Sequence, residues 1–178
     1  AEVGGRTPPK ILSTTGVLVG GDDLDKEIMR SLLKYFGEGS RLKSGDAFPT
    51  FIMDMLDGWQ NMPTLSQPRY QRIIDELLQT STNPAAIQAL KTLITQNLGF
   101  ELFREIERAK KRLSSEEAVM LRFSHGHIDI RERITRQHFE AMISEEIGLV
   151  EEGLHQILAE AELEASKIDV VLRTGGTS

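Results

Sequence analysis

The sequence predicts a mixed fold of the α/β class, α+β in its details, that is mostly helical. Two observations predict this class. Apolar residues recur at helical spacing through most of the chain, and short runs rich in β-branched residues occur near both ends and after the middle. Helices interleaved with strands are typical of α/β and α+β architectures. The 178 residues, 39% of them hydrophobic, are enough for one domain or for two small subdomains.

Residues 1–44 are predicted to form a strand or hairpin arm followed by a helix. The strand is the β-branched run Ile11–Val19, which ends at a pair of glycines. Asp22 or Asp23 is expected as the N-cap of the helix, because a short carboxylate side chain can accept hydrogen bonds from the first free N–H groups. The apolar face of this helix consists of Leu24, Ile28, Leu32 and Leu33.

Residues 45–100 are predicted to be a block of helices and not a flexible linker. Pro68 in a first turn and Asn83 before Pro84 mark where two of these helices begin. Apolar residues recur at helical spacing at Ile73, Leu77, Ile87, Leu90 and Ile94. Exposing this many apolar side chains would be costly, so we expect the block to pack against the rest of the fold.

Residues 101–178 are predicted to alternate between helices and strands. The expected elements are a helix over Phe100–Leu113, hairpin arms over Ala118–Phe123 and His127–Arg131 around Ser124, His125 and Gly126, a helix capped by Thr135, a helix after Gly148 and a strand over Ile168–Leu172.

Composition excludes several classes of function. A net charge of −6 argues against nucleic-acid binding, because phosphate backbones recruit basic stripes. The absence of cysteine excludes disulfides, thiolate metal sites and cysteine nucleophiles. No apolar run approaches the ~18 residues that a membrane span needs, and no export signal opens the chain. We therefore expect a soluble, cytoplasmic protein without a membrane partner.

The end of the chain resembles a phosphate-binding loop. The predicted strand Ile168–Leu172 is followed closely by Gly175, Gly176 and Thr177. Glycines after a strand let bare backbone N–H groups approach a phosphate, although an ordinary turn would use the same residues. The loop stops before the helix that should follow it, and Ala1 is not an initiator methionine. The chain is therefore expected to be a piece of a larger nucleotide-binding domain.

The helix over Phe100–Leu113 carries two stripes. One is apolar and consists of Leu102, Ile106, Ala109 and Leu113. The other is polar and consists of Glu107, Lys110, Lys111 and Ser114. It can be a solvated face with helical salt bridges, or it can contact ribose and adenine, since a carboxylate holds sugar hydroxyls and a lysine stem can lie over a base.

Other polar clusters carry weaker signals. His125 and His127 flank Gly126 without an evident third ligand, so an exposed hairpin tip is expected there and not a metal site. Asp22, Asp23 and Asp25 can cap a helix or lie near a phosphate-bound Mg²⁺ ion through water. No nucleophile with an adjacent base is evident, so no catalytic residue is expected in this chain.

Four segments, in order, resemble the second lobe of the ATPase domain of the seventy-kilodalton heat-shock chaperones, the DnaK-like family. They are Gly20–Asp25, Glu107–Ser115, Ile134–Glu140 and Ile168–Gly176. The resemblance implies an actin-like ATPase fold, of which this chain would cover the upper part of lobe two. The block 45–100 exceeds the family's usual linker here, and it resembles the divergent bacterial branch whose members tend to lack the peptide-binding domain.

The resemblance implies a nucleotide site built from several matching positions. Glu107, Lys110 and Ser114 match positions that hold the ribose and adenine, and Lys111 stands where the family usually has an arginine stacked on the base. A lysine is a poorer planar stacker, which puts base preference in question. In the terminal loop, Gly175 and Gly176 match the adenosine and phosphate loop, with Thr177 as the small polar residue after it.

The resemblance also implies a cofactor and partners. The chain is expected to be a nucleotide-binding lobe fragment of a chaperone ATPase that uses ATP or ADP, with Mg²⁺ in the parent protein and a co-chaperone or exchange factor as a further partner. The family's catalytic lysine and metal-orienting aspartates lie outside this chain, so the fragment alone is expected to be inactive. An alternative is a nucleotide-sensing pseudo-enzyme or interaction protein whose partner surface is the helical insertion 45–100.

Overall fold

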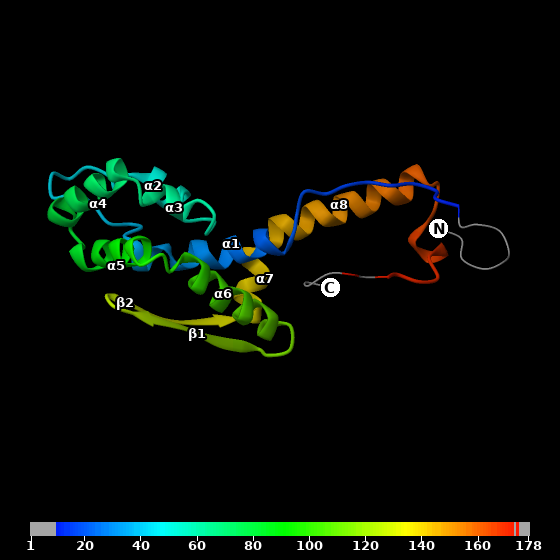
Figure 1. The fold of residues 1–178 in the computed structure, drawn as a ribbon. Helices are drawn as coiled ribbons and strands as arrows, with labels where there is room; N and C mark the ends of the chain where they lie inside the picture. The colour runs from blue at the N-terminus through cyan, green and yellow to red at the C-terminus, as the bar shows by residue number, and fades with distance from the viewer. Residues whose placement is uncertain (1–9, 173, 175–178) are drawn as a thin grey trace. The chain divides into compact units, whose positions relative to one another are not determined.

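The computed structural model describes residues 10–172 and 174, and it divides them into two compact units (Figure 1). The central unit is Leu24–Met142. The terminal unit contains the described residues up to Asp23 and from Ile143 onward. Helices dominate both, and the one sheet among the described residues has two antiparallel strands. The prediction of a helix-rich α+β chain is therefore confirmed.

The first helix begins earlier than the sequence suggested. Helix α1 spans Gly21–Leu32 and continues into the 3-10 turn η1, Leu33–Phe36. Neither Asp22 nor Asp23 is the N-cap, because both lie inside the first turn. Asp23 Oδ2 accepts a hydrogen bond from the N–H of Gly20 at 2.9 Å. This reach back to the residue before the helix is the reciprocal half of a capping box. A left-handed Gly37 (φ 110°) ends η1.

The block over residues 45–100 is helical, as predicted. Its helices are α2 (Thr50–Asp54), α3 (Met62–Leu65), α4 (Pro68–Thr80) and α5 (Pro84–Thr95). The Oδ1 atom of Asn83 caps α5 by accepting a hydrogen bond from the N–H of Ala86 at 3.3 Å. Because α5 contacts α4, η1 and the second strand of the hairpin, the block packs as part of the central unit.

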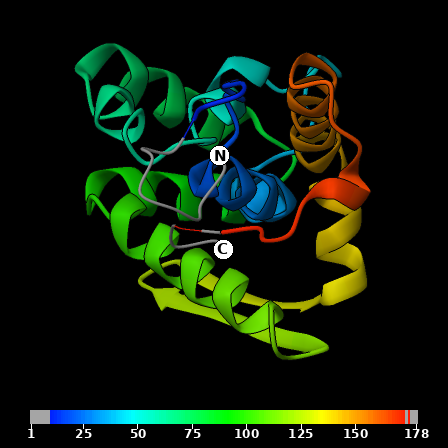
Figure 2. The same cartoon turned by 90° about the vertical axis from the view of Figure 1, so that its right-hand side faces the viewer.

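The hairpin closes the other side of the central unit. Strand β1 (Ala118–His125) pairs with β2 (Ile128–Thr135), and helix α6 (Gly99–Leu113) contacts β1, as Figures 1 and 2 show. Both strands extend further than predicted, because the turn needs only Gly126 and His127. Gly126 has φ 56°, and a two-residue hairpin turn requires such positive φ values.

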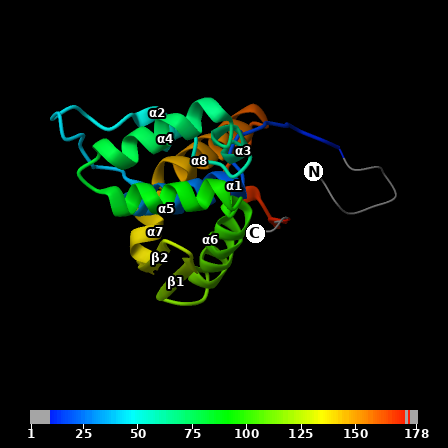
Figure 3. The same cartoon turned by 60° about the vertical axis from the view of Figure 1, so that its left-hand side comes forward.

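The core of the central unit lies on α5, between the helices α2–α4 and the hairpin, a layering that Figure 3 shows from the side. Fully buried side chains in this core include Leu32, Phe36, Leu65, Ile74, Ile87, Leu90, Leu93, Leu102, Ile106 and Ile130. Helix α7 (Arg136–Met142) follows β2 directly, and Thr135 Oγ1 caps it by accepting from the N–H of His138 at 3.1 Å. The helix start predicted at Thr135 is confirmed.

The terminal unit is built on helix α8 (Ser144–Glu160), which begins before Gly148 and not after it. The extended segment 10–20 runs along α8: Ser13 Oγ donates to Glu160 Oε2 at 2.5 Å, and Val17 lies against Gly153. A short 3-10 turn, η2 (Ala165–Lys167), follows.

Two predicted strands are not formed. Residues 11–19 and 168–172 are extended, but neither segment makes the inter-strand hydrogen bonds of a sheet, because no neighbouring strand lies beside them among the described residues. A β-branched run becomes a strand only where a partner supplies those hydrogen bonds. In the part of the chain that the structure describes, no helix has both the length and the apolar composition needed to cross a lipid bilayer.

Candidate functional site

Helix α6 supports the polar stripe that the sequence singled out. Its predicted apolar stripe is buried: Leu102, Ile106, Ala109 and Leu113 are each at most 5% exposed. This burial against the rest of the central unit fixes how α6 is rotated about its axis. The rotation in turn determines which of its polar side chains reach solvent.

Glu107 and Lys111 lie on the exposed side of α6 and form an ion pair. Lys111 Nζ donates to Glu107 Oε1 at 2.7 Å, and the side chains are 54% and 46% exposed. The hydrogen bond and the charge of Lys111 lower the pKa of Glu107 against a weaker opposing effect of burial, and the charges of Lys110 and Arg104 lower it slightly further. The carboxylate of Glu107 is thus ionised at neutral pH and accessible from solvent.

Ser114 stands at the end of α6, next to this pair. Its Oγ donates a hydrogen bond to the carbonyl oxygen of Lys111 at 2.6 Å, and the residue is exposed. A hydroxyl that donates to the backbone can still accept a hydrogen bond through its oxygen lone pairs. Glu107, Lys111 and Ser114 therefore present acceptors and a cation together on one accessible surface.

Lys110 differs from its neighbours, because it is buried. Its Nζ lies 2.9 Å from Asp25 Oδ1 on α1, and the side chains are only 8% and 9% exposed. For this residue the expectation of a solvated charged face is wrong. The ion pair joins α1 to α6 and fixes the place of the Lys110 ammonium at the inner edge of the polar stripe.

Asp25 is the residue that sequence reasoning did not connect to this stripe. From the sequence, Asp25 is expected only as a helix cap or as a water-mediated neighbour of Mg²⁺. A signal was present, because Asp25 shares the helical face of Ile28, Met29 and Leu32, all of them buried. A carboxylate on a buried face needs a partner of opposite charge, and Lys110 is that partner.

The second part of the expected nucleotide site is the glycine loop at the end of the chain. Gly175, Gly176 and Thr177 lie outside the described residues, and the last described position, Thr174, belongs to the terminal unit. The structure therefore describes the polar stripe on α6 but not the predicted glycine loop.

The histidines of the hairpin are the remaining candidates for a metal site. His125 and His127 are exposed at the tip of the hairpin, and His125 Nε2 lies 3.9 Å from Glu101 Oε2. Within the described residues, no cluster of three or more histidine, aspartate or glutamate side chains is placed to hold a metal ion. A cavity of about 310 Å³ lies elsewhere in the central unit. Its lining includes Arg30, Leu33, Phe48, Met53, Asp54 and Asp57.

Comparison with known proteins connects this geometry to one family. Residues 67–178 match the family described as Hsp70 protein. The chain is also 39% identical over 74 residues to heat shock protein hsp88 of Neurospora crassa. That alignment covers 40% of this chain and 10% of the fungal protein, so the matched part spans about a tenth of that relative. The family match contains all seven predicted site positions, whereas Asp25 lies before it.

Proposed function

The chain belongs to the Hsp70 family, and we propose that it forms the adenosine-binding side of a chaperone ATPase. The observation that carries this proposal is the family match over residues 67–178, because it includes both the polar stripe of α6 and the terminal glycine loop. More specifically, we place the chain in the second lobe of an actin-like ATPase domain. The bacterial branch suggested by the helical insertion, and a cytoplasmic location, are proposals of the same kind.

Within this proposal, Glu107 and Ser114 bind the ribose and Lys111 lies along the base. The chemistry of these side chains fits an adenosine. An ionised, accessible carboxylate accepts hydrogen bonds from a ribose diol, and a serine hydroxyl can serve either a sugar oxygen or a ring nitrogen. The lysine stem offers an apolar surface to the purine.

Lys110 has a different part in the proposed site. Its ammonium is held by Asp25, so it stays at a fixed place at the edge of the site, with its charge balanced by that carboxylate. Gly175, Gly176 and Thr177 complete the site as the loop that approaches the phosphates. The nucleotide is ATP or ADP. The Mg²⁺ that accompanies it is held in the parent protein by groups outside this chain, and a co-chaperone or exchange factor is a further partner.

Calorimetric titration of ATP and ADP into the full-length protein tests the proposal. Replacing Glu107 by alanine should remove a charge-assisted hydrogen bond of about 1.5 to 3 kcal/mol, or about ten- to a hundredfold in affinity. The matched control is Glu105→Ala, which removes another glutamate that is ion-paired on α6, to Arg108, away from the stripe. Equal affinities for wild type and Glu107→Ala would leave the Glu107–Lys111 pair as an ordinary surface salt bridge.

A second candidate function is a nucleotide-sensing interaction protein without turnover. The observation that favours it is the exposed aromatic pair of Trp59 and Phe100, at the insertion and the start of α6, whose rings are 5.4 Å apart and meet edge to face. Exposed aromatic side chains are typical of binding surfaces. Measuring ATP hydrolysis by the full-length protein separates the two functions, because nucleotide binding without turnover would favour the second.

A further inference from the structure

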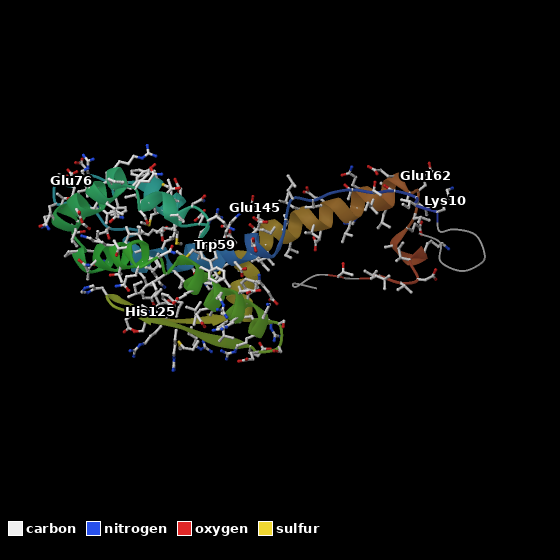
Figure 4. All side chains as sticks on the ribbon, in the orientation of Figure 1. Lys10, Trp59, Glu76, His125, Glu145 and Glu162 are labelled. Atoms are coloured by element: carbon white, nitrogen blue, oxygen red, sulfur yellow. The ribbon has the colours of Figure 1, made fainter. Side chains whose placement is uncertain are left out.

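We propose that the outer face of the β1–β2 hairpin is a docking surface for an extended, acidic segment of a partner protein. We call this surface the arginine face. It consists of the residues that alternate away from the core, namely Met120, Arg122 and Ser124 on β1 and Asp129, Arg131 and Arg133 on β2. Figure 4 shows side chains tipped with nitrogen projecting from the side of the hairpin that faces away from α6.

The strand register places two like charges opposite each other. Arg122 pairs directly with Arg131 across the two strands. The Cβ atoms of such a pair are about 4.5 to 5.5 Å apart, and like charges in this arrangement destabilise a sheet. Both side chains are exposed, so no buried counterion compensates this repulsion. A binding function explains why the face has this arrangement.

Most of the positive charge on the arginine face has no partner on that face. Asp129 pairs with Arg131 at 3.1 Å, but Arg131 remains 73% exposed, and neither Arg122 nor Arg133 forms an ion pair with a described residue. Three arginines and one aspartate give this face a positive balance, whereas the whole chain carries −6. The sign of this surface is therefore opposite to that of the rest of the protein, and it fits an anionic ligand.

The spacing of the arginines fits an extended peptide. Arg131 and Arg133 are two positions apart on one strand, or about 6.8 Å, and Arg122 is directly across from the first of them. An extended segment with carboxylates at every second residue has the same repeat. Arginine can bind each carboxylate through two parallel hydrogen bonds, which favours such a match over a diffuse attraction.

The composition of the face favours a protein segment over a nucleic acid. Met120, which is 41% exposed and opposite Arg133, offers an apolar contact to a peptide side chain. None of the six residues of the arginine face is aromatic, so bases would find no stacking platform there.

Fluorescence anisotropy with a labelled peptide of alternating glutamate and threonine tests the proposal on the full chain. The double variant Arg122→Ser, Arg133→Ser should weaken binding about five- to thirtyfold, because exposed ion pairs contribute about 0.5 to 1 kcal/mol each. The matched control is Arg69→Ser with Arg72→Ser, which removes the same charge from two exposed arginines on α4. The control should change the affinity less than twofold, and a peptide with lysine in place of glutamate should not bind.

The experiment also has outcomes that would overturn the proposal. Equal losses in the two double variants would show a general charge effect and no docking surface. Tighter binding of an oligothymidine or of anionic phospholipid vesicles than of the peptide would assign the arginine face to a different partner. Denaturation of Arg122→Ser separates binding from folding: relief of the Arg122–Arg131 repulsion should leave stability unchanged or raise it, so a binding loss cannot be attributed to unfolding.

Discussion

Lys110 and Asp25 form an ion pair of 2.9 Å between α6 and α1, with less than a tenth of either side chain exposed. Both residues come from segments that the sequence linked to nucleotide binding, yet their shared property is burial. Removing two charges from water is costly, and their attraction offsets the cost only when both partners are present. The pair therefore joins α1 to α6 beside the apolar contacts that α1 makes through Ile28, Met29 and Leu32.

We predict that replacing either partner alone destabilises the protein strongly. Asp25→Ala or Lys110→Ala should each lower the free energy of unfolding by about 3 to 5 kcal/mol, because each leaves a buried charge without its counterion. The double variant Asp25→Leu, Lys110→Met should be much less affected. Urea denaturation of the four proteins measures these differences.

The exposed pair of Lys91 and Asp75, 2.6 Å apart, is the control for this series. Lys91→Ala should cost at most about 1 kcal/mol, as is typical for ion pairs at the surface. Single variants of Asp25 and Lys110 that cost no more than Lys91→Ala would contradict the prediction. In that case Lys110→Ala could also be used to probe nucleotide binding, because a change in affinity would not be mixed with a loss of stability.

A second prediction concerns pH and the contact between η1 and β2. Burial raises the pKa of Glu132, but hydrogen bonds from Lys34 and Tyr35 and the charge of Lys34 outweigh it, so the pKa lies below 4.5. A carboxyl whose pKa is lowered by folding stabilises the protein above its unfolded pKa. That stability is lost as the pH falls from about 4.5 through the folded pKa.

The measurement is the urea midpoint of wild type and Glu132→Gln at pH 7, 4.5 and 3. The difference between the two proteins should be largest at pH 7 and should shrink toward pH 3, because wild-type Glu132 becomes protonated. Glu140→Gln, which removes an exposed carboxyl from α7, should show no comparable trend. A constant difference between wild type and Glu132→Gln over this range would disprove the linkage.

Two glycines in α8 should respond in opposite ways to substitution by alanine. A Cβ at Gly153 would lie 2.4 Å from Val17 Cγ2, whereas a Cβ at Gly148 would meet nothing within 4 Å. Gly153→Ala should therefore cost about 1 to 3 kcal/mol and loosen the segment 10–20. Gly148→Ala should stabilise by about 0.5 to 1 kcal/mol, since alanine loses less entropy in a helix.

Urea denaturation measures both effects as changes in the free energy of unfolding. Adding Val17→Ala to Gly153→Ala should recover part of the loss by making room for the new methyl group. An unchanged free energy of unfolding in Gly153→Ala alone would mean that the segment does not pack on α8 at this position.

The fold was predictable where local patterns agree with tertiary packing. The apolar stripe of α6, from Leu102 to Leu113, repeats at helical spacing, and the structure buries it. Asn83 and Thr135 were identified as helix starts because their side chains supply acceptors whose effect is local. Such features need no knowledge of distant residues.

Other features depend on partners that a single sequence does not specify. The run Ile11–Val19 has strand composition, but no neighbouring strand among the described residues pairs with it, so it stays extended along α8. The burial of Lys110 could not be read from α6 alone, because its counterion Asp25 is 85 positions away on α1. The sequence identified the stripe of α6 as part of the proposed nucleotide site. The structure adds that Glu107, Lys111 and Ser114 in this stripe are exposed, whereas Lys110 is buried.

The last prediction concerns Lys111, where this chain differs from the family pattern that the rest of the stripe resembles. Lys111 stands where an arginine would lie flat on the base, and its ammonium pairs with Glu107 four residues earlier. An arginine could keep that pair, since the spacing allows it, and would add a planar guanidinium above the purine. Lys111→Arg should therefore raise the affinity of the full-length protein for ATP and ADP about two- to fivefold, the equivalent of about 0.5 to 1 kcal/mol.

Calorimetric titration measures the change, with Arg108→Lys as the control, because Arg108 pairs with Glu105 outside the stripe. Thermal stability should stay the same in both variants, since both positions are exposed. If Lys111→Arg leaves the affinity unchanged while Glu107→Ala lowers it, the base does not lie over Lys111, and only the ribose part of the proposed site would remain.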